Sequence, residues 1–489
     1  MQVVWLKRDL RVHDHAPLAE AALRAGEGGA PVVVLYVHEP SYWAATEHDA
    51  AQFAFIQECL AELDVALRER GAFLTQRVGE MPDVLDALHR AVRITHLYSH
   101  METGNGLTYA RDLRVAEWCR THNVPWTERL QNGVVRRLRD RDGWSTRWNH
   151  RMQRPLVRAP ERVLAAPVDP GSSPSSWDLG LSASTRPERQ RGGEARGITL
   201  LDSFLSRRAL GYETHLSSPN DAWDGCSRLS PYLAFGALSL RRVTHLTDRR
   251  RRRVRDAAWR ASLDAFRSRL QWRCHFMQKL ESSPRIEHES MNQALDTLWD
   301  RDAKKHLDAW QEGQTGYPMV DAAMRCLAAT GWINFRMRAM LVSFATHLLW
   351  LHWRHPAIHL AQCFVDYEPG IHFPQVQMQA GATGINALRI YDPTKQARDQ
   401  DPEGTFIRRW VPELEAVPRA YLATPSTLPK EMQRSLGAVV GQHYPVPIVD
   451  ARAAARHARQ RLEDARREPE VRRRGARVLR RHGSRRRRF

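Results

Sequence analysis

Short apolar runs alternate with amphipathic stretches over residues 1–130 of the chain. The predicted strands lie at 3–6, 32–37, 72–76, 96–99 and near Trp126. The predicted helices lie at 16–24, 50–68, 81–91 and 107–120. Because strands that alternate with helices form a parallel sheet covered on both faces, the pattern predicts an α/β, doubly wound parallel-sheet domain. This domain has neither a GxGxxG sequence nor a Walker P-loop, so it carries no nucleotide fingerprint.

The pattern changes after residue 130. Residues 131–197 lose regular patterning and contain Ser-, Pro-, Gly- and Arg-rich stretches, which indicates an interdomain linker that crosses the surface. Residues 198–450 have few strand signals and strong helical periodicity, as at 257–280 and 330–353. They predict a large all-helical domain that can enclose a cofactor. The helix at 330–353 is expected to end before Pro356, with a loop at 366–379.

Basic residues are concentrated at the C-terminal end. The formal net charge is +19, and residues 451–489, with 16 arginines and 4 acidic residues, contribute +12 of it. This tail has helical spacing up to Pro469 and then becomes an arginine cluster, so we expect a solvated, disordered arm that the core fold does not need. A second basic run, 249–255, predicts a solvated helix end or, alternatively, a contact with DNA phosphates.

Several classes of protein are disfavoured. No run of 18 apolar residues occurs and the N-terminus has no signal-peptide pattern, which predicts a soluble cytoplasmic protein without a membrane partner. The six cysteines (59, 119, 226, 274, 326 and 363) form no CxxC pair, so we expect no metal site and no disulfide framework. A monomer is the default expectation.

The most informative stretch runs from Trp310 to Leu414. Arg338 lies in the first turns of a predicted helix and Asp366 in the loop after it. Such a pair beside a buried site would hold a planar, partly charged ligand, although it could equally be a salt bridge that joins a loop to a helix. The Asn, His, Gln and Gly around a Trp-rich helix suit a flat aromatic cofactor rather than a metal.

A second candidate site is the sequence CSRLS at 226–230, before the helix-like 231–239. Hydroxyls, amides and an arginine at a helix start form an anion cradle, or else an ordinary helix N-cap.

Long motifs give these segments a family context. They are VVWLKRDLRVHDHAPL (3–18), SRLSPYLAFGALSLRRV (227–243), TGYPMVDAAMR (315–325), D-x-E-x-G (366–370) and FIRRWVPEL (406–414). With these motifs the chain resembles the photolyase and cryptochrome family over nearly its whole length, the tail excepted. The resemblance implies FAD in the helical domain.

The resemblance also implies site residues. Cofactor binding would fall to Tyr212, Cys226, Ser227, Arg228, Leu229, Ser230, Trp272, Asn334, Arg338, Asp366, Glu368 and His372. By this resemblance, the serine and arginine turn at 227–230 would bind the FAD diphosphate, and the Arg338–Asp366 pair would lie next to the isoalloxazine ring. Catalytic roles would fall to Trp272, His372 and Trp353, and DNA contacts to Arg269, Trp272, Arg273, Arg336 and Met378.

The chain departs from the family pattern at five positions. The family usually has Thr at Cys226, Asn at His372 and an acidic residue at Arg269. Val376 replaces the tryptophan nearest the flavin in the electron-transfer chain, and Met378 replaces a second substrate-stacking tryptophan. Trp353 matches the middle member of that chain, and Trp350 or another tryptophan is a candidate for the missing one. A histidine opposite the flavin N5 edge can donate or accept a proton.

The implied function is light-driven DNA repair, in which excited reduced FAD donates an electron to a flipped-out pyrimidine dimer. The alternative is a cryptochrome-like blue-light photoreceptor without repair activity, which the departures at Arg269 and Val376 favour. A light-independent flavin oxidoreductase lacks a recognisable nicotinamide site.

An antenna chromophore, folate or deazaflavin, is a further expectation for the N-terminal domain. The stretch SHMETGNGLTYARD (99–112) is its expected location, with Glu102 as the polar contact. The alternative is an ordinary strand-to-helix loop.

Overall fold

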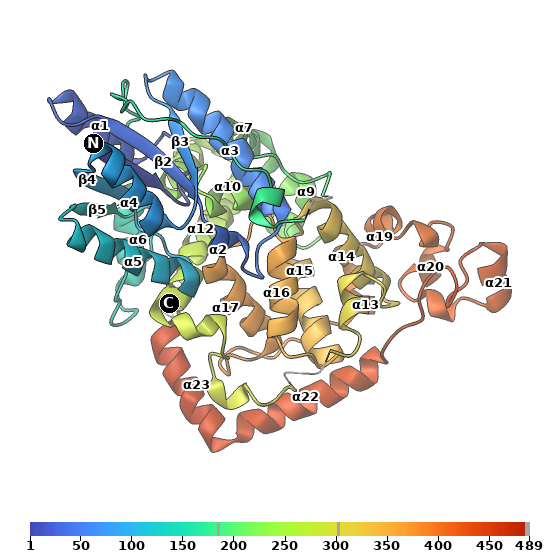
Figure 1. The fold of residues 1–489 in the computed structure, drawn as a ribbon. Coiled ribbons are helices and arrows are strands. Elements are labelled where there is room, and N and C mark those ends of the chain that lie inside the picture. Colours follow the sequence, from blue (N-terminus) through green and yellow to red (C-terminus); the bar gives the residue numbers. More distant parts are fainter. Residues whose placement is uncertain (183–185, 301–303, 485–489) are drawn as a thin grey trace.

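The N-terminal part is a five-stranded parallel sheet in the order β3-β2-β1-β4-β5 (Figure 1). The structure is a computed structural model that describes residues 1–182, 186–300 and 304–484. The strands are β1 (Gln2–Leu6), β2 (Val32–His38), β3 (Leu74–Val78), β4 (His96–His100) and β5 (Trp126–Arg129). The helices are α1 (Ala16–Gly26), α2 (Pro40–Trp43), α3 (Ala50–Arg68), α4 (Met81–Val92) and α5 (Gly106–Thr121). The predicted α/β class is confirmed; only the short α2 was missed.

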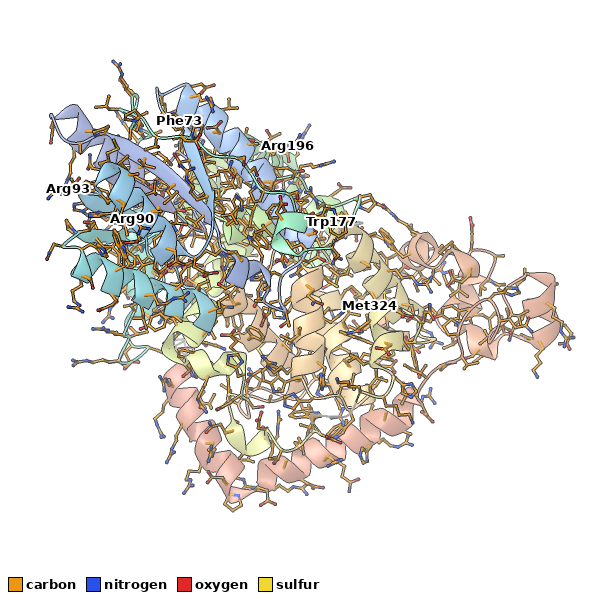
Figure 2. The ribbon with its side chains drawn as sticks, viewed as in Figure 1. Phe73, Arg90, Arg93, Trp177, Arg196 and Met324 are labelled. Carbon is orange, nitrogen blue, oxygen red and sulfur yellow. The ribbon has the colours of Figure 1, made fainter. Side chains whose placement is uncertain are left out.

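The linker packs against this sheet. It contains α6 (Trp144–Gln153) and η1 (Trp177–Leu179). The backbone N–H of Val32 donates to Leu164 O at 2.8 Å and that of Ala166 to Val32 O at 3.0 Å, so the linker extends the hydrogen bonding of β2. Trp177, labelled in Figure 2, is 72% exposed. Over its described residues, the segment 131–197 therefore packs as an ordered part of the α/β region, with Trp177 at the surface.

The remainder is helical, as predicted. From the linker to the start of the tail its elements are α7 (Glu194–Ser203), η2 (Phe204–Arg208), α8 (Tyr212–His215), α9 (Ala222–Gly225), α10 (Ser230–Ala234), α11 (Leu240–Arg253), α12 (Ala257–Ser282), η3 (Pro284–Glu287), η4 (Gln293–Leu295), α13 (Leu307–Gln311), α14 (Pro318–Thr330), α15 (Phe335–Ser343), η5 (Phe344–Leu348), α16 (Arg354–Cys363), α17 (Pro369–Ala380), α18 (Pro393–Gln400), α19 (Thr405–Trp410), η6 (Pro412–Leu414), α20 (Arg419–Leu422), η7 (Pro425–Thr427) and α21 (Lys430–Ser435). The basic run 249–255 is the end of α11, where Arg251 pairs with Asp264.

Two predicted elements differ in the structure. The helix predicted at 330–353 is shorter, because Gly331 adopts a left-handed conformation (φ 66°) that ends α14, and the next helix runs through α15 and η5 from Phe335 to Leu348. The predicted loop at 366–379 is mostly the helix α17, which begins at Pro369, a favoured first helical residue. A Cβ added to Gly370 would lie 2.8 Å from the Cα of Met277, so this glycine permits α17 to approach α12 closely.

The tail also differs from its prediction. Over the residues described, it forms α22 (Ala451–Arg467) and α23 (Pro469–His482), which run as a V along the outer side of the helical domain (Figure 1). Leu462 is fully buried, and Asn292 Nδ2 donates to Val471 O at 2.9 Å. Nitrogen-tipped side chains project outward along both helices (Figure 2). The expected disordered arm is therefore an amphipathic helix pair whose apolar face completes the domain.

Leu462→Ala is expected to lower the free energy of unfolding by about 2–5 kcal/mol, because it leaves a cavity against the helical core. Leu479→Ala is the matched control, since Leu479 lies on α23 and is 54% exposed. Denaturant unfolding measures both. If Leu462→Ala lowers the free energy of unfolding as little as Leu479→Ala does, the tail does not pack against the helical core as described.

Candidate cofactor site in the helical domain

The predicted ion pair is present and has bidentate geometry. Arg338 Nη1 and Nη2 donate to the two carboxylate oxygens of Asp366 at 3.0 and 2.8 Å. Arg338 Nε also donates to Ile333 O at 2.8 Å, and its guanidinium lies 3.9 Å from the centre of the Phe364 ring. Four contacts therefore fix the plane of the guanidinium. The Asp366 side chain is 4% exposed and that of Arg338 24%, so the pair is accessible from the arginine side.

Glu368, two residues later, connects the two domains. It accepts hydrogen bonds from Arg8 of the α/β domain at 3.4 Å and from Arg273 of α12 at 3.0 Å. Arg8 also donates to Tyr367 O at 2.7 Å. A polar cavity of about 30 Å³ lies beside these three side chains and Glu102, with room for one or two water molecules. The Glu102 carboxylate itself accepts from Arg111 at 2.5 Å, so the predicted antenna contact is already paired within its own domain.

The serine and arginine turn is only partly as expected. The helix α10 has five residues and ends at Ala234, and Gly236 (φ 67°) turns the chain where the sequence predicted a continuous helix. Arg228, with φ 57°, is buried between the indoles of Trp223 and Trp332, 4.1 and 4.0 Å from their centres. Burial lowers its pKa to about 10, and Asp366 is among the charges that act on it. The turn therefore lies close enough to the ion pair for the Asp366 charge to act on Arg228.

The start of α15 is tied to the segment at 216–217. Asn334 Nδ2 donates to Leu216 O and Ser217 O, both at 3.0 Å, and Arg336 donates to Ser217 Oγ at 3.0 Å. The Asn334 Oδ1 atom is buried and has no hydrogen-bond partner within the described parts of the chain. An orphaned acceptor of this kind is satisfied by a ligand N–H or a water molecule.

His372 lies on α17 rather than in a loop. Its Nε2 donates to Ala357 O at 2.7 Å, and burial lowers its pKa to about 4, so the ring is neutral at physiological pH. Because the proton is on Nε2, Nδ1 is free to act only as an acceptor. Val376, one helical turn later, is 4% exposed, whereas Met378 is half-buried.

The aromatic site residues occupy two regions. Half-buried Trp272 packs against His275 and Phe276 of α12, with ring centres 4.9 and 5.6 Å away, and exposed Arg269 lies one turn before it. Tyr212 is buried against Phe204 and Phe266, and burial raises its pKa.

The second aromatic region surrounds Trp353. It is fully buried and donates from Nε1 to Ser290 Oγ at 3.0 Å. Trp299, which the sequence did not single out among 16 tryptophans, lies 5.9 Å from Trp350 and 6.4 Å from His352. Trp350 in turn contacts His457 of α22. Trp350 therefore lies at the outer side of the domain, against the tail.

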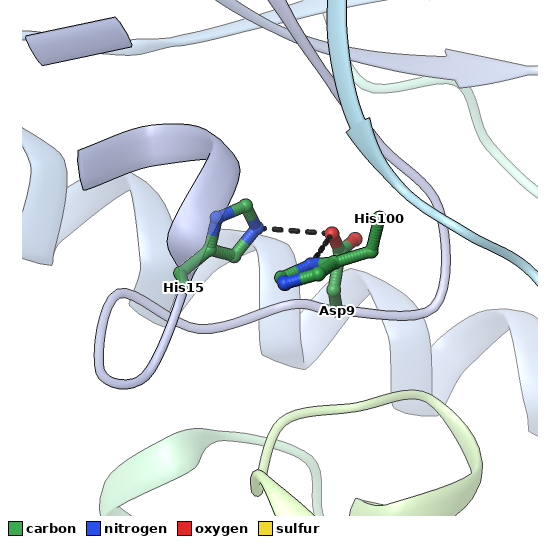
Figure 3. Close-up of side chains that lie close together, drawn as sticks. All are labelled: Asp9, His15 and His100. Carbon is green, nitrogen blue, oxygen red and sulfur yellow. Dashed lines mark hydrogen bonds and ion pairs between the residues drawn. The ribbon is translucent and has the colours of Figure 1, made fainter. Parts of the chain in front are cut away.

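A buried polar cluster in the α/β domain was also missed. His15 Nε2 and His100 Nδ1 lie 3.0 and 2.7 Å from Asp9 Oδ2 (Figure 3). These three residues offer the types of ligand that bind a metal. However, His15 Nδ1 accepts from the Leu18 N–H at 3.1 Å as the N-cap of α1, which puts the ring proton on Nε2, facing Asp9. This arrangement favours a hydrogen-bonded core cluster over a metal centre.

Comparison with known proteins identifies the family. Residues 266–464 match the model for the FAD binding domain of DNA photolyase, and residues 2–138 match the DNA photolyase model. Cryptochrome DASH from Gloeobacter violaceus is 30% identical over 476 residues, which cover 92% of this chain and 93% of that protein. The chain belongs to the photolyase and cryptochrome family. The deoxyribodipyrimidine photo-lyase of Streptomyces griseus is 32% identical to this family member over 475 residues, covering 94% and 98% of the two chains.

Structural comparison gives the same family. The crystal structure of a class III photolyase from Agrobacterium tumefaciens matches this photolyase-family chain with a TM-score of 0.84 and 27% identity, covering 96% of this chain and 98% of that one. The FAD-binding match extends into α22, which agrees with the packed tail. Among the described residues of this family member, no helix is both long and apolar enough to cross a membrane.

The residues present fit FAD, the cofactor that the family match gives. The bidentate pair can flank a ring, Asn334 Oδ1 is an unsatisfied acceptor, and no partner is found in the described residues for the Ser227 and Ser230 hydroxyls.

The buried neutral histidine makes stability depend on pH. Since the pKa of His372 is about 4 in the folded protein and about 6.5 when unfolded, the unfolded state binds more protons below pH 6.5. Lowering the pH from 7 to 5 should therefore remove about 2 kcal/mol of unfolding free energy through this residue. His372→Asn should make the pH dependence correspondingly shallower in denaturant titrations, whereas the same change at the exposed His150 should not. An unchanged slope in His372→Asn would contradict the assignment.

Proposed function

We propose that the protein repairs pyrimidine dimers in DNA with light. The observation that carries the proposal is the position of Trp272 on α12, half-buried, with the exposed Arg269 one turn away. An indole at the rim of a cofactor domain provides a surface on which a flipped-out base stacks, and the cation attracts the adjacent phosphate. Relatives named deoxyribodipyrimidine photo-lyase, about 30% identical over nearly the whole chain, support this assignment.

The chain's own residues would bind and orient FAD, which supplies the light absorption and the electron when bound. Arg338 and Asp366 hold the ring from one side. Ser227, Ser230 and Arg228 bind the diphosphate, and Tyr212, Cys226 and Leu229 form the apolar wall beside it. Trp353 belongs to the route by which electrons reach the cofactor.

His372 and Asn334 would set the polar environment of the ring. With its proton on Nε2, His372 presents only a lone pair at Nδ1, so it would accept a hydrogen bond from a ring N–H and favour the forms of the cofactor that carry one. Asn334 presents Oδ1, also an acceptor.

The residues proposed to contact DNA differ in whether their side chains already bind other parts of the protein. Arg273 already donates to Glu368 and to Leu233 O, so it positions α12 and Glu368 rather than DNA. Arg269 is exposed and Met378 is half-buried, and both are available at the surface. Arg336 is bound to Ser217 Oγ and supports α15.

The second candidate function is a blue-light photoreceptor without repair activity. A cation at Arg269, where the family usually has an acid, cannot accept a hydrogen bond from a pyrimidine N–H, and this observation favours signalling. A relative named cryptochrome DASH supports the same candidate.

Arg338→Ala is expected to lose most of the bound FAD, because it removes both hydrogen bonds to Asp366 and leaves that carboxylate buried without its partner. Arg325→Ala is the control, since Arg325 also pairs with a carboxylate of this domain, Glu413, at 2.7 Å. The ratio of flavin to protein absorbance measures both. Retention of stoichiometric FAD in Arg338→Ala would refute the role of the ion pair.

Incubation with a dimer-containing oligonucleotide, in light and in darkness, tests the repair proposal. The wild-type protein should restore thymine only in light, and Trp272→Ala should weaken dimer binding by about 1–3 kcal/mol through lost stacking. Trp177→Ala, at the 72% exposed linker tryptophan, should not. A flavin-loaded protein that restores no thymine in light would select the photoreceptor.

A further inference from the structure

A hollow of about 160 Å³ lies between α23 and the segment 285–293, several times the volume that one water molecule needs. Its wall carries Arg285, Arg474, Arg477, Arg481 and His482, together with Gln293, and none of its lining residues is a carboxylate. Arg285 and Arg474 have carboxylate partners outside the wall, Glu289 and Glu470. No carboxylate partner is found within the described chain for Arg477 or Arg481. The wall is therefore positively charged and partly uncompensated.

A second layer of basic side chains, two cations and a neutral histidine, lies behind this wall, on α12 and the segment before α6. Lys279, His275 and Arg141 are 6%, 7% and 4% exposed. Arg141 Nη2 donates to His275 Nδ1 at 2.5 Å, and Lys279 Nζ lies 4.6 Å from the centre of the Phe276 ring. Within the described residues no carboxylate lies at ion-pair distance from Lys279. A buried ammonium in this condition is costly unless an anion compensates it.

His482 joins the two layers. It is 4% exposed, lines the hollow, and its buried Nδ1 has no hydrogen-bond partner in the described part of the protein. Burial and the nearby charges of Lys279, Arg481, Arg141 and Arg285 lower its pKa to about 3. Burial, and then Arg141, lower the pKa of Lys279 to about 8. The charges that act most strongly on these two groups are positive, so the potential in the hollow is positive.

We propose that this hollow binds a phosphate group, either a phosphodiester of a nucleic-acid strand or the phosphate of a small molecule. Arg477 and Arg481 contact the oxygens, His482 is the deepest polar group, and Lys279 supplies charge from behind. Trp272, His275 and Lys279 follow one another at helical spacing on α12, so Lys279, behind the hollow, lies about 10 Å along the helix from the base-stacking indole. The site requires neither FAD nor light, so failure of the repair assay leaves it untouched.

Titration calorimetry of the full-length, flavin-loaded protein with inorganic phosphate tests the proposal. The double variant Arg477→Gln, Arg481→Gln should bind phosphate roughly tenfold or more weakly, since each charge-assisted hydrogen bond is lost. Arg456→Gln combined with Arg459→Gln, two exposed positions on α22, is the matched control for net charge and should bind as the wild type does. Equal losses in both double variants, or no binding by the wild type, would overturn the proposal.

Lys279→Met separates binding from folding. Without phosphate, its melting temperature should equal or exceed that of the wild type, because an uncompensated buried charge is removed. The rise in melting temperature that phosphate produces in the wild type should be absent. A variant that keeps the full phosphate-dependent rise would contradict the role of Lys279.

Two further probes identify the source of the phosphate. The first probe is a lesion-free single-stranded oligonucleotide. If it binds the Arg477, Arg481 double variant more weakly than it binds the α22 control double variant, the phosphate belongs to a nucleic-acid strand. The second probe is adenosine monophosphate. If both double variants bind the oligonucleotide equally, but the Arg477, Arg481 variant alone binds adenosine monophosphate more weakly, the phosphate belongs to a small molecule. Both results support a phosphate site, whereas unchanged binding of both probes would leave no ligand for it and reject it.

Discussion

The loop between α16 and α17 carries the interactions on which the rest of the structure depends. Asp366 binds Arg338 of α15, and Glu368 binds Arg273 of α12 and Arg8 of the α/β domain. Two carboxylates in one short loop thus connect two helices and two domains. Because both are almost fully buried, each requires its arginines, and the loop, the helices and the domain interface are stable only together.

This loop also determines the state of His372. It begins α17 at Pro369, which places His372 one turn into a helix and directs its Nε2 to Ala357 O. His372 is therefore a neutral imidazole whose Nδ1 can only accept a hydrogen bond. Arg228, in the serine and arginine turn, is held in the same way by packing, buried between two indoles.

The tail changes the electrostatics of the molecule without leaving its fold. Leu462 and Val478 pack against the helical core, while the arginines between them remain on the outer face or around the hollow beside Lys279. The apolar face anchors the helices, and the charge they carry is thereby held at one fixed place. A basic segment that the sequence presents as a flexible arm becomes, in three dimensions, the wall of a site.

Local pattern by itself determined the strands β1 to β5, the long helix α12 and, through the motifs, the Arg338–Asp366 pair, because apolar periodicity and ordered motifs are properties of neighbouring residues. Tertiary structure decided the remainder. Helix α17 forms despite Pro374 because Gly370 lets it pack on Met277, and α22 and α23 order because the core offers them an apolar surface. The burial of Arg228 against Trp332 and the pairing of Asp9 with His100 depend on partners far away in the sequence. No periodicity encodes such contacts, because they arise only when the elements pack together.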